Sequence, residues 1–209
     1  MGIIIKEVTQ SHIPQIKNIV KHIWAWEEMS ESEEVLNATL TMYMNNVLYD
    51  STYGRAAFVD GKMVGVIFGI MNGQYPKYRM MVENSMNPAI ALINASNNER
   101  KAFSEYMTKI NAAYAQLLKG KENNYDGTLN FLVLSKEARG LGIGKKLWLT
   151  LAEHFKSHKA KSIYVYTDSD CNFKFYEHLG FNKAGALPIT IDIYGKPYSP
   201  DIFMYDYDF

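Results

Sequence analysis

The chain has 209 residues, which is long for one small domain and short for two full-sized ones. Hydrophobic residues make up 47% and charged residues 21%, the balance of an ordinary globular protein, which argues against a disordered chain. Lys and Arg together number 22, as do Asp and Glu, so the formal net charge is zero. Because general nucleic-acid binders are usually basic, we expect no nucleic-acid partner.

A single cysteine, Cys171, excludes an intrachain disulfide and fits a reducing compartment. Near the N-terminus only three consecutive apolar residues, Ile3–Ile5, precede a charge, whereas a secretory signal needs roughly 7–15. No stretch approaches the ~18–20 apolar residues of a membrane-spanning helix. The sequence therefore predicts a cytoplasmic protein without a membrane partner.

The N-terminal part is expected to form a strand followed by two helices. β-branched residues predict a strand over Ile3–Val8. Ser11 can cap the helix that follows, with Pro14 in its first turn. Ser30 and Glu33 have the spacing of a capping box at the start of a second helix.

A hairpin and a helical insertion are expected next. Two strand-like runs flank Asp60 and Gly61, which favour a tight turn because both tolerate a positive φ. Residues 72–127 then interrupt the pattern, beginning with many Asn, Gly, Pro and Tyr residues and continuing into an amphipathic helix over residues 99–119. The expected strands of the hairpin are residues 55–59 and 63–70.

The C-terminal part alternates strands and helices, so the order as a whole predicts a mixed α/β domain around one sheet. The helices are expected at residues 142–156 and 171–179. The strands are expected at residues 129–134 and 162–166, and near residues 181–194 and 202–207.

A glycine-rich loop stands between an expected strand and helix. Its glycines leave backbone N–H groups bare, and the helix start adds partial positive charge, so the loop suits a phosphate or pyrophosphate. The spacing fails the dinucleotide fingerprint G-x-G-x-x-G, and it fails the P-loop pattern because no Ser or Thr follows the Gly-Lys pair. The loop reads Arg139, Gly140, Leu141, Gly142, Ile143, Gly144 and Lys145.

Read as R-x-x-G-x-G, with Arg139, Gly142 and Gly144, this loop resembles the pyrophosphate-binding loop of the GNAT superfamily of N-acetyltransferases. The apolar strand before it, Leu132–Leu134, lies at the offset usual in that family. About thirty residues after the loop, residues 175–181 have the form F-Y-x-x-x-G-F and resemble the family's second sequence block. The order and spacing of these elements are more specific than any one of them.

The resemblance implies a fold and a domain organisation. The fold is a GNAT-like α/β architecture, with a central splayed, mostly antiparallel sheet flanked by helices. Residues 1–209 would form a single N-acetyltransferase domain, with the core signature at 129–183. The helical insertion at about 72–127 has no counterpart in the minimal fold.

The resemblance also implies a site for acetyl-CoA as co-substrate, with no metal. The backbone N–H of Leu134 would stabilise the developing oxyanion, and Tyr176 would protonate the departing thiolate. Asn172 stands where the family often has Ala, and Ser169 stands where it often has Asn, so the resemblance leaves open which of the two contacts the cofactor. The implied cofactor-binding residues are Leu132, Leu134, Arg139, Gly140, Gly142, Ile143, Gly144, Lys145, Asn172 and Tyr176.

The implied reaction is acetyl transfer to a primary amine of a small molecule, by direct attack in a ternary complex. A protein or peptide acceptor and a non-catalytic CoA-binding sensor stay open as alternatives, as does a homodimer. The general base is not identified. An acidic cluster near the second helix could attract a cationic amine, but a helix-dipole role is the simpler interpretation. The cluster consists of Glu27, Glu28, Glu31, Glu33 and Glu34.

Other candidates carry less chemistry. His154 and His158 have metal-ligand spacing, but no third ligand is evident and a solvated helix face is the expected environment. Cys171 lacks a neighbouring base in the sequence. Aromatic residues that could line an apolar acceptor pocket are Trp24, Trp26, Tyr43, Tyr49 and Tyr53.

Overall fold

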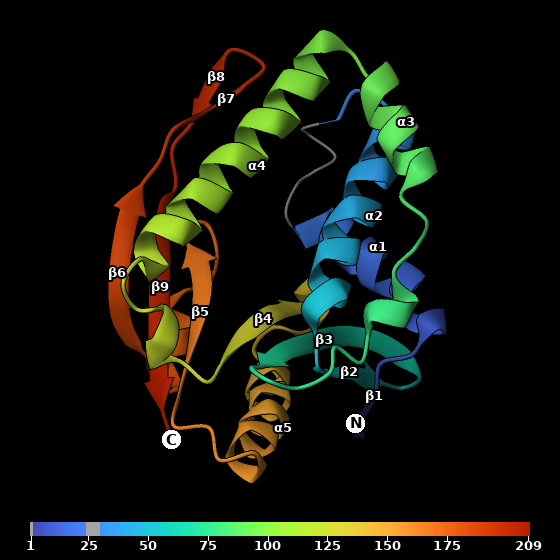
Figure 1. Ribbon diagram of the computed structural model, residues 1–209. Coiled ribbons are helices and arrows are strands. Elements are labelled where there is room, and N and C mark those ends of the chain that lie inside the picture. Colours follow the sequence, from blue (N-terminus) through green and yellow to red (C-terminus); the bar gives the residue numbers. More distant parts are fainter. Residues whose placement is uncertain (1, 24–29) are drawn as a thin grey trace. The chain divides into compact units, whose positions relative to one another are not determined.

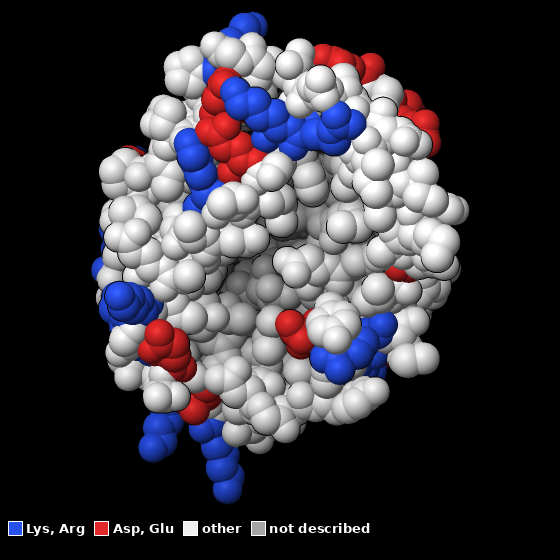
Figure 2. Space-filling model, turned by 45° about the horizontal axis from the view of Figure 1, so that its top comes forward, with Lys and Arg blue, Asp and Glu red and all other residues white. Residues whose placement is uncertain are grey.

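The computed structural model describes residues 2–23 and 30–209. The chain forms two compact units (Figure 1). The first comprises residues 1–92 and 129–159, and the second comprises residues 93–128 and 160–209. None of the described helices is both long enough and apolar enough to cross a membrane. Figure 2 shows acidic and basic side chains interspersed on the face drawn, in line with the zero net charge.

The first unit contains four neighbouring strands in the order β1-β2-β3-β4. The β1–β2 and β2–β3 pairs are antiparallel. Asp60 and Gly61 join β2 to β3 with φ angles of 49° and 80°, which confirms the predicted tight turn. The strands are β1 (Ile3–Glu7), β2 (Tyr53–Val59), β3 (Lys62–Met71) and β4 (Gly127–Leu134), of which the part from Leu129 onward lies in this unit.

Helices pack against these strands: α1 contacts β3, and α5 contacts both β2 and β3. The predicted caps are wrong in detail. Ser11 lies inside a 3₁₀ turn that Thr9 precedes, and Ser32 rather than Ser30 caps α2, its side chain accepting from the Val35 N–H at 3.1 Å. The helices are α1 (Ile13–Ile23), α2 (Glu33–Asp50), α3 (Met86–Asn94), whose end lies in the second unit, and α5 (Ile143–Ser157).

The second unit builds its sheet around β5. The first two residues of β4 pair with it in parallel, as Gly127↔Ile163 and Thr128↔Tyr164, whereas β5–β9 and β6–β9 are antiparallel. The mostly antiparallel sheet with flanking helices confirms the predicted fold class. The strands are β5 (Ser162–Asp168), β6 (Asn182–Pro188), β7 (Ile191–Ile193), β8 (Lys196–Tyr198) and β9 (Asp201–Asp208), and the helices are α4 (Asn97–Leu118) and α6 (Lys174–His178).

Three predicted elements need correction. The predicted helix over 171–179 is the shorter α6, because the first residues form a turn. The strand expected near 181–194 is two strands, β6 and β7, and β7 pairs with the unpredicted β8. Helix α3 was read as loop, since its sequence combines Asn and Pro over little more than two turns.

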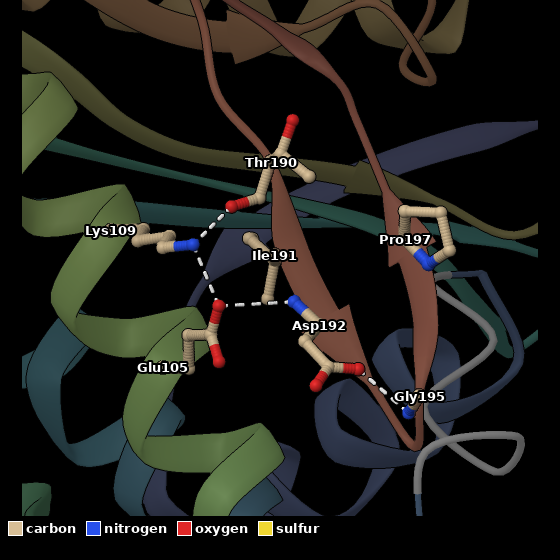
Figure 3. A pocket seen from close by; sticks show the side chains of 7 residues that line it. All are labelled: Glu105, Lys109, Thr190, Ile191, Asp192, Gly195 and Pro197. Atoms are coloured by element: carbon tan, nitrogen blue, oxygen red, sulfur yellow. Dashed lines mark hydrogen bonds and ion pairs between the residues drawn. The ribbon is translucent and has the colours of Figure 1, made fainter.

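The β7–β8 hairpin is clasped to α4 by polar contacts (Figure 3). Lys109 donates to the Thr190 carbonyl and to Glu105 Oε1, and Glu105 Oε1 also accepts the Asp192 N–H at 3.1 Å. One turn earlier on α4, Lys101 pairs with Asp192 at 2.8 Å. These residues border a cleft of about 300 Å³. Their charges are satisfied by one another, so we assign this cleft a structural role.

His154, expected on a solvated helix face, is instead partly buried against Tyr53, with ring centroids 4.5 Å apart. Its Nε2 atom is buried and has no hydrogen-bond partner among the described residues. Burial, followed by the nearby charges of His158, Arg55 and Lys77, lowers the pKa of His154 to about 4. The folded protein therefore holds this imidazole neutral at neutral pH.

The buried imidazole should make the free energy of unfolding depend on pH. Its folded pKa lies below the unfolded value of about 6.5, so the unfolded chain takes up the proton first as pH falls, and stability is lost between pH 6.5 and 4. His154→Phe, which keeps a ring against Tyr53, should reduce this loss in urea denaturation at pH 7 and 5. His178→Phe, at an exposed histidine, should retain it. An unchanged pH dependence in His154→Phe would contradict the assignment.

Candidate functional site

The glycine loop at the start of α5 has the backbone form that its glycines permit. Gly140 and Gly142 have φ angles of 78° and 71°, in the left-handed region, and Gly142 is the residue immediately before α5. A Cβ atom at either position would meet no atom within 4 Å, so the space beside the backbone is open. Ile143 and Gly144 are buried in the first turn of α5, whereas Lys145 is exposed. The first N–H groups of a helix have no partner within it, so this opening can receive an anion.

Strand β4 leads to this loop and presents two different faces. Leu129, Phe131 and Val133 are buried, whereas Leu132 and Leu134 alternate with them and are only partly buried. Leu134 packs directly over Gly65 of β3, where a Cβ atom would collide with the leucine side chain. The close approach of the two strands thus fixes the backbone at Leu134.

A turn at the end of β5 leads into α6, which carries Tyr176. Asp168 Oδ1 accepts the N–H groups of Asp170 at 2.9 Å and Cys171 at 2.8 Å. These two bonds fold the chain back on itself immediately before the helix. Farther along, the Tyr205 hydroxyl donates to Glu177 Oε1 at 2.8 Å and holds α6 against β9.

Tyr176 is only 8% exposed, and its ring contacts Phe181 edge-on with centroids 5.6 Å apart. No described residue forms a hydrogen bond with its hydroxyl. Burial first, then the neighbouring Cys171 and Asp168, raise the pKa of Tyr176 well above its ordinary value. The phenol is therefore protonated at neutral pH, as a proton donor must be, and releases its proton less readily than a solvated tyrosine.

The turn also separates three neighbouring candidates. Ser169 Oγ accepts the Asp201 N–H at 3.1 Å and is thus engaged in the fold, whereas Asn172 is exposed. Burial, then the adjacent Asp168, raises the pKa of the Cys171 thiol to about 12, which keeps it protonated and unsuited to nucleophilic attack. Of the two candidates for cofactor contact, Asn172 is the freer side chain.

Other predicted candidates are placed outside this arrangement. Glu33 and Glu34 occupy the first turn of α2, and Glu33 pairs with Lys21 at 3.0 Å, consistent with the helix-dipole interpretation. No group of three or more possible metal ligands occurs in the part of the chain that the structure describes. Four of the predicted candidates lie outside the described residues: Trp24, Trp26, Glu27 and Glu28.

The structure also gathers side chains that the sequence did not single out. Tyr106 of α4 and Tyr198 of β8 lie beside the carboxylates of Asp168 and Asp170. Three separate elements supply them, so no local spacing announces the group. The only sequence signal was the predicted amphipathic face of α4, to which Tyr106 belongs.

Solved structures share this fold. Polyamine N-acetyltransferase of Drosophila melanogaster, which catalyses the formation of N-acetylagmatine, is 13% identical with a TM-score of 0.59, and 100% of each chain is covered. Ribosomal-protein-alanine N-acetyltransferase of Brucella melitensis is 13% identical with a TM-score of 0.54, covering 99% of each chain. A putative acetyltransferase from Salmonella typhimurium, solved with acetyl-CoA, is 10% identical with a TM-score of 0.54, covering 100% of this chain and 94% of the other.

These identities are low enough that they show the fold alone. No curated protein matches the sequence. A family profile described as Acetyltransferase (GNAT) family, however, matches residues 14–181 and thus most of the chain, including the glycine loop and Tyr176. The protein belongs to the GNAT family of acetyltransferases, as the loop and the F-Y-x-x-x-G-F block predicted.

Proposed function

We propose that the protein transfers an acetyl group from acetyl-CoA to a primary amine of a small molecule by direct attack in a ternary complex. The observation that carries this proposal is the open glycine loop at the N-terminus of α5, with left-handed backbone at Gly140 and Gly142. Membership in the acetyltransferase family supports the reaction class. The whole chain would act as one catalytic domain.

The residues at the loop fit the anionic part of acetyl-CoA. Backbone N–H groups from Gly140 to Lys145 would bind the pyrophosphate, helped by the charges of Arg139 and Lys145. Leu132 and Leu134 would pair with the pantetheine amides as an added strand does, and Asn172 would supply a side-chain contact. Bound acetyl-CoA supplies an activated thioester.

The protein's own groups would then stabilise the reaction. The acceptor nitrogen forms a bond to the carbonyl carbon while the C–S bond breaks, and the nitrogen loses a proton. The Leu134 N–H, held in place by the packing on Gly65, donates to the developing oxyanion. Tyr176 gives its proton to the departing thiolate, and its buried ring keeps the hydroxyl in position.

Tyr176→Phe should lower kcat about 100-fold, the scale typical of a lost general acid, with little change in the Kd of acetyl-CoA. Thiol release and calorimetric binding would measure the two quantities. Tyr125→Phe, which removes a hydroxyl that donates to Asp206, is the matched control and should turn over normally. Wild-type turnover in Tyr176→Phe would remove this residue from the proposed role.

Gly142→Ala should raise the Kd of acetyl-CoA about tenfold, because an L-residue in the left-handed region costs about 1–2 kcal/mol and a shifted loop relieves that cost. Gly73→Ala is the matched control: Gly73 has a φ of 78° and equally open surroundings, but follows β3. Both variants should lose similar thermal stability, and only the first should bind acetyl-CoA more weakly. Equal binding by the two variants would argue against the loop as the pyrophosphate site.

A further inference from the structure

A group of tyrosines and carboxylates lies on the part of the second unit that the proposed mechanism does not use. Tyr106, Tyr166 and Tyr198 come from α4, β5 and β8, and all three pack against one apolar cluster of this unit. The two carboxylates, Asp168 and Asp170, belong to the turn that ends β5. Tyrosine rings and acidic groups from four successive parts of the chain therefore share one location.

Specific interactions tie the group together. The Tyr198 phenol donates to the carboxylate of Asp170. The Tyr106 phenol lies close enough to Asp168 and Asp170 that, after burial, these carboxylates contribute to raising the pKa of Tyr106. The buried Tyr176 also neighbours Asp168, and its hydroxyl has no hydrogen-bond partner among the described residues. An unpartnered buried hydroxyl thus faces the same carboxylate.

The carboxylates of this group lack a cation. Asp168 and Asp170 form no ion pair with residues 2–23 or 30–209. On the same unit, by contrast, Asp192 and Glu105 are each paired with a lysine of α4 (Figure 3 draws the contacts of Lys109 and Glu105). Those lysines and Glu105 recur every fourth residue along α4 and share one face, whereas Tyr106 lies on a neighbouring face. Negative charge is neutralised at the clasp and left available at the tyrosines.

Such a group favours an organic cation. A carboxylate attracts an ammonium directly, and the face of a tyrosine ring adds an attraction of about 0.5–2 kcal/mol. The same surroundings repel a carboxylate or phosphate on the ligand. The hydroxyls of Tyr106 and Tyr198 stay neutral, because burial, and for Tyr198 the hydrogen bond to Asp170, raise the pKa of both phenols.

We infer that Asp168 and Asp170, together with the rings of Tyr106 and Tyr198, bind a second positive charge of the acceptor, which is therefore a di- or polyamine. This inference rests on the proposed function and specifies its substrate class. A nitrogen held by a carboxylate stays protonated, since an opposite charge raises the pKa of an amine, and a protonated nitrogen has no lone pair for attack. The nitrogen bound here is thus distinct from the one that is acetylated.

The test compares two acceptors of equal chain length, 1,4-diaminobutane and 1-aminobutane, by thiol release. The wild-type protein should prefer the diamine in kcat/KM by at least about tenfold, equivalent to about 1.4 kcal/mol. Asp170→Asn removes one charge at an exposed position and should abolish this preference while leaving the KM of acetyl-CoA unchanged. Asp208→Asn, at the opposite end of β9 from the site, is the charge-matched control and should keep the preference.

Two variants of Tyr106 separate the ring from the hydroxyl. Tyr106→Phe should keep the diamine preference, because the ring face carries the attraction, and Tyr106→Leu should reduce it several-fold. Circular dichroism would establish that each variant is folded. A loss of preference in Tyr106→Phe equal to that in Tyr106→Leu would overturn the part assigned to the ring.

Calorimetric titration of 1,4-diaminobutane into the protein makes the inference independent of turnover. Binding that Asp170→Asn weakens and Asp208→Asn does not would support it. Absence of diamine binding to the wild-type protein, or equal use of the two acceptors by an active enzyme, would overturn it. An active enzyme with equal acceptors would still satisfy the proposed acetyl transfer, so the two failures are distinguishable.

Discussion

The turn that ends β5 is the constraint on which the candidate chemistry depends. One carboxylate oxygen of Asp168 accepts two successive backbone N–H groups and redirects the chain into α6. The redirected helix is short, so its position comes from tertiary contacts: the Tyr205–Glu177 hydrogen bond and the packing of Tyr176 on Phe181. A single turn thereby sets both the proposed proton donor and the carboxylates proposed to select the acceptor.

Helix α4 shows how one element can serve structure and specificity on neighbouring faces. Lys101, Glu105 and Lys109 hold the β7–β8 hairpin, and their charges are consumed in that contact. The hairpin in turn carries Tyr198 to Asp170. The predicted insertion is thus the segment that supplies the aromatic part of the proposed acceptor site, and family members without such a segment would need other residues for that purpose.

Much of the fold could be predicted from sequence because its signals are local. The Asp60-Gly61 turn, the amphipathic α4 and the glycine loop each depend on residues within a few positions of one another. What sequence reasoning missed is long-range. Ser32 wins over Ser30 as a cap only once α2 is packed, and Tyr106, Asp170 and Tyr198 meet only after three elements assemble. The burial of His154 likewise reflects packing against Tyr53 of another element, which periodicity within α5 could not reveal.

The central claim is that this chain is an acetyl-CoA-dependent amine acetyltransferase. Its most direct test is multiple-turnover thiol release from acetyl-CoA across polyamines, aminoglycosides, amino acids and short peptides, with the acetylated product identified by mass spectrometry. Cys171 can add at most one equivalent of background thiol, so only repeated turnover counts. The account predicts sustained release with amines that carry a second positive charge, and acetyl-CoA binding in calorimetry. Absence of acetyl-CoA binding, or binding without release for every amine, would contradict it.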